Sequence, residues 1–345
     1  MAYTTIPKST AQFNTKLYTG NYSTNAITGV GFQPDLTWIK SRTTAGEDHY
    51  LFDAIRGVTN YIHSNTSAAQ GTNSATLTTF GSDGFTVGAN NSVNKSSDSL
   101  VSWNWKANGQ GSANTDGTIN STYTSANTTS GFSIVQYTGN GTAGATVGHG
   151  LGAAVKTIII KKYNTSSDWV YGSSGMGFTK YMNLNSTGAE SAYAGMFNDT
   201  APTSSVFTLG ADGQVNTNGG TYVAYCFADV QGFSKMGSYI GNGNANGTFA
   251  YTGFKPAFIL VKNTGSVRNW QIYDSKRIGY NYNNYRLPPN TAGSEESNLN
   301  IDIYSNGFKT LATDADVNEN AKTYIFLAFA EEPLVSTNGQ PATAR

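Results

Sequence analysis

The sequence has little charge of either sign. Only 12% of its 345 residues are Asp, Glu, Lys or Arg, against roughly 25% in a typical soluble domain, and 21 basic residues balance 21 acidic ones. Nucleic-acid binding needs a basic surface that displaces counterions from phosphates, and an anionic membrane surface attracts basic proteins in the same way. The formal net charge of zero therefore argues against both kinds of partner.

Cysteine and long apolar runs are missing as well. Cys226 is the single cysteine, so no intramolecular disulfide can form and the core alone must hold the fold. The opening residues, MAYTTIPKSTAQF, contain no apolar run of the kind found in secretion signals. The longest apolar stretch, around Tyr324–Ala330, is too short to span a bilayer. We therefore expect synthesis in a reducing cytosol and no membrane insertion.

The residues that replace the missing charges favour strands and turns. The chain contains 39 Gly, 21 Tyr and 17 Phe, together with many Asn, Ser and Thr. Aromatic and β-branched residues are enriched in strands, and Gly, Asn and Ser in turns. Disordered chains are poor in aromatic residues, so this composition indicates a folded protein with a neutral, polar surface.

Four short blocks recur three times in the same order, which identifies an internal repeat. The units span about residues 16–107, 132–229 and 234–331, a period that suits self-contained domains rather than a solenoid. The blocks are YTGN, YTGN and YIGN (18–21, 137–140, 239–242); GFQPDLTWIK, GLGAAVKTIIIK and GFKPAFILVK (31–40, 150–161, 253–262); SDGFTVG, SSVFTLG and SNGFKTL (82–88, 204–210, 305–311); and LVSWNWKA, YVAYCFAD and YIFLAFAE (100–107, 222–229, 324–331).

The closing block alternates with a period of two, which indicates a β-strand. In the first unit Val101, Trp103 and Trp105 form its apolar face, and Ser102 and Asn104 lie on the other face. We expect this strand to be half-exposed in the first unit and covered on both faces in the other two, where the second face is less polar. Several short strands per repeat, separated by turn residues, predict an all-β protein. The predicted architecture is three tandem antiparallel β-sandwich domains of jelly-roll or Greek-key type, each with its own core.

The repeats divide the chain into predicted segments with different properties. The segment between the first two repeats is rich in Gly, Ser, Thr and Asn, so we expect a loose linker with almost nothing to bury. A fragment that begins near Ser130 is then expected to fold alone as a rigid pair of domains. We expect the N-terminal arm to be disordered in an isolated monomer and docked on a neighbour in an assembly. The segments are the N-terminal arm (1–15), β-sandwich repeat 1 (16–107), the linker (108–130), β-sandwich repeat 2 (131–230), β-sandwich repeat 3 (231–332) and the C-terminal tail (333–345).

No stretch of the sequence has a catalytic or metal-binding pattern. His49, His63 and His149 occupy unrelated repeat positions and lack the spacing of metal ligands, and Cys226 lies within a strand pattern. The stretch Asp314–Asn318 begins like a calcium loop but lacks the required glycine and the closing glutamate. We therefore predict no catalytic residue, no metal and no cofactor.

Two alternatives rest on other residues. A hydrolase that acts on polysaccharides needs two facing carboxylates, for which Glu190, Glu295 and Glu296 are the candidates related by the repeat, with Gln70 near that place in the first unit. A carbohydrate-binding module would use aromatic faces instead. For the rings of the second and third repeats we favour a place in the core, and keep a glycan or partner contact as the alternative. These rings are Trp169, Tyr171, Trp270 and Tyr273.

The motifs closely resemble a family of repeated-domain structural proteins encoded by marine bacteriophages, notably cyanophages and pelagiphages. The resemblance covers about residues 16–331. It implies a virion component, structural or tail-fibre-like, without indicating which one, and it supplies no catalytic motif. The runs that carry it are YTGN, GVGFQPDLTWIK, LFDAIRG, LTTFGSDGFTVG, VSWNWKA, GFSIVQYTGNGTAGATVGHGLG, GFKPAFILVK and YIFLAFAE.

The resemblance, together with the neutral surface, leads to one functional expectation. We expect a non-enzymatic virion surface protein, assembled in the host cytoplasm and displayed on the particle exterior. It would be a compact tail-fibre tip that binds the host receptor, or a knob that decorates the capsid. The expected partners are other capsid or tail proteins, further copies of this chain in a homo-oligomer such as a trimer, and a host-surface glycan, but neither nucleic acid nor membrane. A lectin-like module and a cell-surface polysaccharide depolymerase are the alternatives.

Overall fold

The chain folds into antiparallel β-sheets with a few short helical turns, so the all-β prediction is confirmed. The computed structural model describes residues 3–277, 285–297, 301–333 and 335. The strands of the three main sheets are, in repeat 1, β1 (Phe13–Thr19), β3 (Leu36–Ser41), β4 (Tyr50–Asp53), β5 (Asn60–His63), β6 (Gly71–Thr72) and β9 (Ser99–Trp105); in repeat 2, β10 (Tyr123–Asn127), β11 (Phe132–Thr138), β13 (Thr157–Lys162), β14 (Trp169–Ser173), β15 (Lys180–Asn183), β16 (Ser191–Ala192) and β18 (Thr221–Phe227); and in repeat 3, β19 (Ser234–Ile240), β21 (Phe254–Asn263), β22 (Gln271–Asp274) and β27 (Thr323–Pro333).

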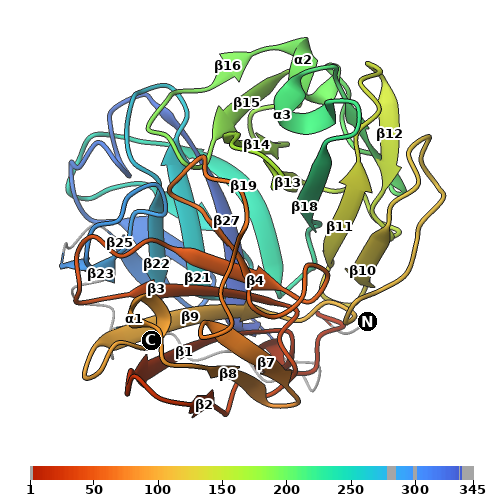
Figure 1. Cartoon of the computed structure of the whole chain (residues 1–345). Coiled ribbons are helices and arrows are strands. Elements are labelled where there is room, and N and C mark those ends of the chain that lie inside the picture. The colour runs from red at the N-terminus through yellow and green to blue at the C-terminus, as the bar shows by residue number, and fades with distance from the viewer. Residues whose placement is uncertain (1–2, 278–284, 298–300, 334, 336–345) are drawn as a thin grey trace.

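The three main sheets share one strand order. The last strand of each repeat lies in the middle, between the first strand and the strand of the second block, as in β1-β9-β3, β11-β18-β13 and β19-β27-β21. The sheet then continues outward through β4, β14 or β22. Figure 1 shows the repeats as three lobes, red to orange, yellow to green and cyan to blue, around a common centre.

A smaller sheet covers one face of each main sheet. Between the two sheets lie separate apolar clusters in repeats 1 and 2, one around Phe52, Phe85 and Leu100 and the other around Tyr137 and Phe207. The remaining elements are β2 (Asn25–Ile27), β7 (Leu77–Gly81) and β8 (Gly84–Val87); β12 (Ala145–Gly148) and β17 (Val206–Leu209); β20 (Phe249–Tyr251), β25 (Ile301–Tyr304) and β26 (Gly307–Thr310); β23 (Tyr285–Arg286) and β24 (Glu296–Ser297); and the helices η1 (Ser9–Ala11), α1 (Asn91–Asn94), α2 (Ala194–Phe197) and α3 (Gly213–Asn216).

The other face of every main sheet points into one central core that all three repeats share. The ring of Phe258 in repeat 3 lies 5.8 Å from that of Trp103 in repeat 1, and Phe227 in repeat 2 lies 5.7 Å from Phe329 in repeat 3. The expectation of three separate cores therefore needs correction. The central strands of the main sheets are buried on both faces, because each sheet packs one face under its small sheet and the other against the two neighbouring main sheets.

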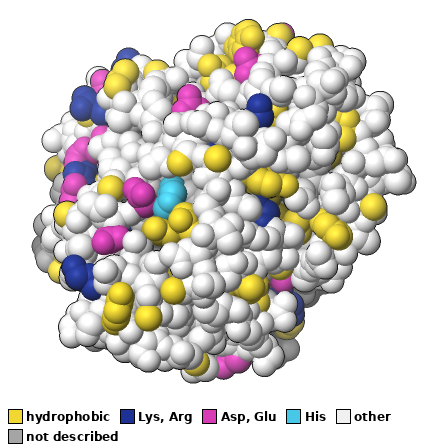
Figure 2. Space-filling view, viewed as in Figure 1, with side chains coloured by type: hydrophobic (Ala, Val, Ile, Leu, Met, Phe, Trp, Pro, Cys, Tyr) yellow, Lys and Arg dark blue, Asp and Glu magenta, His cyan; other side chains and the backbone are white. Residues whose placement is uncertain are grey.

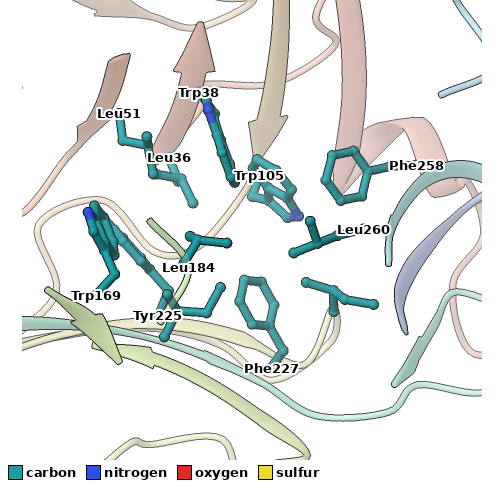
Figure 3. A pocket seen from close by; sticks show the side chains of 12 residues that line it. Leu36, Trp38, Leu51, Trp105, Trp169, Leu184, Tyr225, Phe227, Phe258 and Leu260 are labelled. Carbon is teal, nitrogen blue, oxygen red and sulfur yellow. The ribbon is translucent and has the colours of Figure 1, made fainter. Parts of the chain in front are cut away.

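A small cavity lies within this central core. Its volume is about 20 Å³, and its lining contains no polar surface. Figure 3 shows side chains from all three repeats converging on it, among them Trp38, Phe227 and Phe258. The space is close to the minimum for one water molecule, but a water there would find no hydrogen-bond partner. The cavity marks the point where the three main sheets meet.

The YTGN block hydrogen-bonds the end of the first strand of each repeat to the helical turn before the last strand. The Tyr18 hydroxyl donates to the carbonyl of Val93 at 2.7 Å, and the Asn21 N–H donates to Oδ1 of the buried Asn94 at 3.0 Å. A Cβ at Gly20 would lie 2.0 Å from the carbonyl oxygen of Lys95, so only glycine fits there. The equivalent tyrosine bonds recur in the other repeats, from Tyr137 to Val215 and from Tyr239 to Val317.

The expected linker and arm are part of the folded body. Residues 108–130 supply β10, which pairs with β11, and Ile119, which forms a parallel bridge with Val147 and is 7% exposed. In the arm, Ile6 is buried in the central core, and the Tyr3 hydroxyl donates to the carbonyl of Gly253 at 2.6 Å. The arm therefore docks on its own chain. Nearly all of the C-terminal tail lies outside the described residues.

The last strand of repeat 1 also differs from expectation. Ser102 and Asn104 are fully buried, so this strand is covered on both faces. The burial is tolerated because Asn104 accepts a hydrogen bond from the Thr37 hydroxyl at 3.1 Å and donates one to the carbonyl of Asn14, also at 3.1 Å.

The shared core predicts that repeats 2 and 3 do not fold without repeat 1. A fragment of residues 131–345 would expose the rings of Phe258 and Phe329 that face Phe13, Trp103 and Trp105 in the intact chain. We expect it to show no cooperative thermal unfolding by circular dichroism, whereas the intact chain shows one transition. A cooperative melt of the fragment with native-like spectra would contradict the shared core.

Candidate functional site

The aromatic residues singled out from the sequence lie in the central core. Trp169 and Trp270 are 0% exposed, and Tyr171 and Tyr273 are 1% and 0% exposed. Their ring faces are therefore not available to a glycan on the surface of the folded chain. Tyr171 packs against Trp270 of the next repeat, with ring centroids 4.7 Å apart.

These tryptophans connect each repeat to the one before it. Nε1 of Trp169 donates to the carbonyl of His63 in repeat 1 at 2.8 Å, and Nε1 of Trp270 donates to the carbonyl of Asn183 in repeat 2 at 3.1 Å. In repeat 1 the same position holds His49, whose Nε2 lies 3.1 Å from the carbonyl of Pro288 in repeat 3. The three bonds form a closed ring around the molecule.

His49 is held in one neutral tautomer. Its Nδ1 accepts from Nε1 of Trp38 at 2.9 Å, and a tryptophan can only donate. Its Nε2 must then carry the hydrogen that is donated to Pro288. Burial keeps the pKa of His49 well below its ordinary value, and the nearby charge of Lys40 lowers it further. The structure therefore uses this histidine as a structural donor.

Two buried ion pairs seal two of the three boundaries between repeats. Asp53 pairs with Arg56 at 2.6 Å and accepts the hydroxyl of Tyr225 from repeat 2 at 2.7 Å. Asp274 pairs with Arg277 at the same distance and accepts Nε1 of Trp103 from repeat 1 at 2.9 Å. In both cases the buried carboxylate is neutralised by an arginine and accepts a further hydrogen bond, as a buried charge requires.

At the third boundary, between repeats 2 and 3, the positions equivalent to these ion pairs are uncharged. In repeat 2 the positions of the aspartate and arginine hold Ser173 and Met176, and the position of repeat 3 that is equivalent to Tyr225 and Trp103 holds Leu327. Repeat 3 thus has no hydrogen-bond donor at the position of Tyr225 and Trp103, and repeat 2 has no acidic residue at the position of Asp53 and Asp274.

The lysine that ends each copy of the second block is buried, and in repeats 2 and 3 it donates across a boundary. Nζ of Lys161 donates to the carbonyl of Ser67 in repeat 1 at 2.9 Å, and Nζ of Lys262 donates to that of Thr187 in repeat 2 at 3.3 Å. Lys40 donates to the carbonyl of Ser41. All three are 0% exposed, and burial lowers the pKa of each to about 8.

The other candidate residues are engaged in similar contacts. The Glu190 carboxylate pairs with Lys180 at 2.6 Å, and Glu295 pairs with Arg42 at 2.8 Å and with Arg277 at 3.3 Å. Their backbone N–H groups donate across boundaries, to the carbonyls of Thr264 and Arg42 respectively. The two glutamates thus belong to different boundaries and do not form a facing pair.

The remaining candidates serve the interior or the local turns. Cys226 is buried, which raises the pKa of its thiol. Asp314 accepts the N–H of Asp316 at 2.8 Å, and it pairs with Arg286 at 3.1 Å. Within the described ranges, no group of three or more His, Cys, Asp or Glu side chains is arranged to hold a metal ion.

One aromatic cluster lies at the surface of repeat 1. The rings of Tyr50 and His63 are 4.4 Å apart, those of Tyr50 and Tyr61 are 4.8 Å apart, and Asp48 lies 3.8 Å from Nδ1 of His63. All four side chains are half-buried. Figure 2 shows a histidine at the surface beside acidic and hydrophobic side chains. Burial lowers the pKa of His63, which leaves a neutral imidazole beside a carboxylate.

The equivalent surface positions of the other repeats have different chemistry. In repeat 2, Tyr181 lies beside Asn183, whose amide donates to Gln214 at 3.2 Å. In repeat 3, Arg286 forms an ion pair with Asp316 at 3.3 Å. The outward positions therefore vary among the repeats, while the inward positions keep one scheme of contacts. Single-sequence reasoning missed these surface sets because they lie outside the repeated blocks.

The buried lysines predict a pH dependence of stability. A lysine with a folded pKa of about 8 binds fewer protons above that pH than the unfolded chain, which titrates near 10.5, so stability rises with pH. Between pH 7 and 9, we expect each lysine to add about 1 kcal/mol to the free energy of unfolding. In denaturant titrations, the difference in free energy of unfolding between the native chain and Lys161→Met should grow by this amount from pH 7 to pH 9. For the exposed control Lys8→Met, the difference from the native chain should stay the same over this pH range. Parallel profiles for Lys161→Met would contradict the assignment.

The comparisons with known proteins give one match. No helix in the described part of the chain is long and apolar enough to cross a membrane. A search of curated proteins finds no match. A search of solved structures finds none either. A family model described as "Domain of unknown function (DUF7483)" matches residues 8–333, which include all three repeats and the segment between the first two. The chain therefore belongs to the DUF7483 family.

Proposed function

We propose that the chain is a non-enzymatic structural protein of a bacteriophage virion surface. It would be a compact tail-fibre tip that binds a receptor, or a knob that decorates the capsid. One observation carries the proposal: the buried Trp169, Trp270, Lys161 and Lys262 donate their side-chain hydrogen bonds across the boundaries between repeats, whereas the outward positions differ. Such a body has a fixed interior and a variable exterior, which suits display.

The surface chemistry supports the same role. Figure 2 shows a face made mostly of uncharged polar side chains and backbone, with small separate groups of charged and hydrophobic side chains. A neutral surface of this kind favours contacts through amides, hydroxyls and aromatic rings. We propose further that the ancestral unit was an antiparallel β-sandwich of jelly-roll or Greek-key type, and that the chain works as a homo-oligomer, such as a trimer, bound to capsid or tail proteins.

The two alternatives, a depolymerase and a lectin-like module, require different arrangements of particular side chains. A depolymerase would need two carboxylates around one cleft, but Glu190 and Glu295 pair with Lys180 and Arg42 at separate boundaries. A lectin-like role would need exposed rings, which Trp169 and Trp270 do not offer. A binding role for other aromatic residues is compatible with virion display.

The proposal is tested by locating the chain in purified particles of the bacteriophage that encodes it. Antibodies raised against the purified protein should label the particle exterior in electron micrographs, with pre-immune antibodies as the control. Labelling of the tail together with blocked adsorption to cells would assign a receptor-binding tip. Labelling of the head without an effect on adsorption would assign a capsid knob. Absence of the chain from purified particles, despite its presence in the lysate, would refute the proposal.

A further inference from the structure

Repeat 3 carries two exposed aromatic side chains next to each other on one strand. Phe249 is 42% exposed and Tyr251 is 55% exposed, whereas Ala250 between them is 4% exposed and belongs to the central core. Because side chains alternate along a strand, Phe249 and Tyr251 share the outward face of the small sheet formed by β20, β26 and β25. Large apolar side chains gathered on a soluble surface call for an explanation.

Two further rings complete this surface. Tyr304 on β25 lies across Gly307 from Tyr251 in the strand register, and its ring centroid is 6.0 Å from that of Phe249. Tyr3 of the docked arm lies beside Tyr251, because a Cβ at Gly253 would be 2.8 Å from the Tyr3 hydroxyl and 3.5 Å from the Tyr251 hydroxyl. We call Tyr3, Phe249, Tyr251 and Tyr304 the aromatic platform.

Gly307 lets the platform lie close to the sheet. A Cβ at this position would lie 2.8 Å from Cζ of Phe249 and 2.2 Å from the carbonyl oxygen of Ala250. The absent side chain leaves the space that the phenylalanine ring occupies. Lys309, the strand partner of Phe249, donates through Nζ to Oδ1 of Asn246, so a cation and an amide lie at the edge of the rings.

The small sheets of the other repeats, β2-β8-β7 and β12-β17, lack these rings. In each small sheet one strand carries a buried phenylalanine, and the repeats can be aligned on it. Opposite the residue that follows this phenylalanine, the neighbouring strand has Phe249 in repeat 3, Thr146 in repeat 2 and Ala26 in repeat 1. Two residues further along the strand, Tyr251 corresponds to Gly148 and Thr28. The fold therefore does not require aromatic side chains here, and their presence in repeat 3 indicates a function of that repeat alone.

We propose that the aromatic platform binds a carbohydrate. Ring faces carry partial negative charge and pack against the C–H groups of a sugar ring, while the amide and ammonium groups at the edge can bind its hydroxyls. A stable protein–protein interface buries more than about 1,000 Å² in total, which is far more than four side chains offer. The platform thus has the size of one or two sugar units and an uncharged centre, which suits a neutral glycan.

This inference deepens the proposed display role, since it rests on that role for the source of the glycan at a host surface. The two fail separately. A chain found on the virion that binds no glycan refutes the platform alone, and a chain absent from virions that still binds glycan through these rings refutes the virion role alone.

The test uses the full chain on an array of bacterial and plant glycans, followed by calorimetric titration with the hexasaccharides of glucose, mannose and N-acetylglucosamine. The variants are Phe249→Thr, which introduces the residue that repeat 2 has there, and Tyr251→Thr. The controls are Tyr193→Thr and Val267→Thr, which replace exposed side chains elsewhere, 48% and 69% exposed. Circular dichroism melts should show that all four variants remain folded.

We expect binding to at least one glycan, weakened about tenfold or more by either platform variant and unchanged by the controls. No binding to any array glycan or hexasaccharide would overturn the proposal. Equal weakening by the controls, or binding that the platform variants leave intact, would overturn it too. A change from oligomer to monomer in the platform variants, without glycan binding, would show instead that a second copy of the chain covers these rings.

Discussion

Three β-sheets whose central strands are buried on both faces each need two packing partners. A sheet of this kind cannot remain in water, and its own small sheet covers only one face. The other two main sheets cover the second face, so each repeat completes the core of the others. The rings of Phe13, Trp103, Phe258 and Phe329 are packed across these boundaries. Most of the other features follow from this closure.

Polar groups at the boundaries set the relative position of the repeats. Apolar packing is tolerant of small shifts, but a hydrogen bond between a buried Trp169 indole and the carbonyl of His63 is directional. Burying the charged Asp53–Arg56 pair costs free energy. The hydrogen bond from Tyr225 to Asp53 uses this pair to fix the position of repeat 2 against repeat 1. An interior built in this way leaves the outward residues free to change, and they differ in chemistry from repeat to repeat.

The sequence alone was sufficient for the local structure and insufficient for its assembly. The period-two pattern of the closing block predicted a strand at residues 100–107 and at 222–229, and the structure has β9 and β18 there. The same pattern could not show which partner covers the second apolar face, because a separate sandwich and a shared core bury identical side chains. Composition also misled at residues 108–130, where backbone pairing rather than apolar content orders the segment. The platform residues were missed because repeat comparison highlights what is shared, and Phe249 and Tyr251 are what is not.

The most direct test of the shared core is native-state hydrogen exchange on the intact chain. If the three main sheets form one cooperative unit, the slowest amides of β9, β18 and β27 should exchange with the same opening free energy. Phe258→Ala, a substitution in repeat 3, should then lower that free energy by about 3 kcal/mol or more in all three strands. A decrease confined to β27, with β9 and β18 unchanged, would contradict the shared core and restore three independent domains.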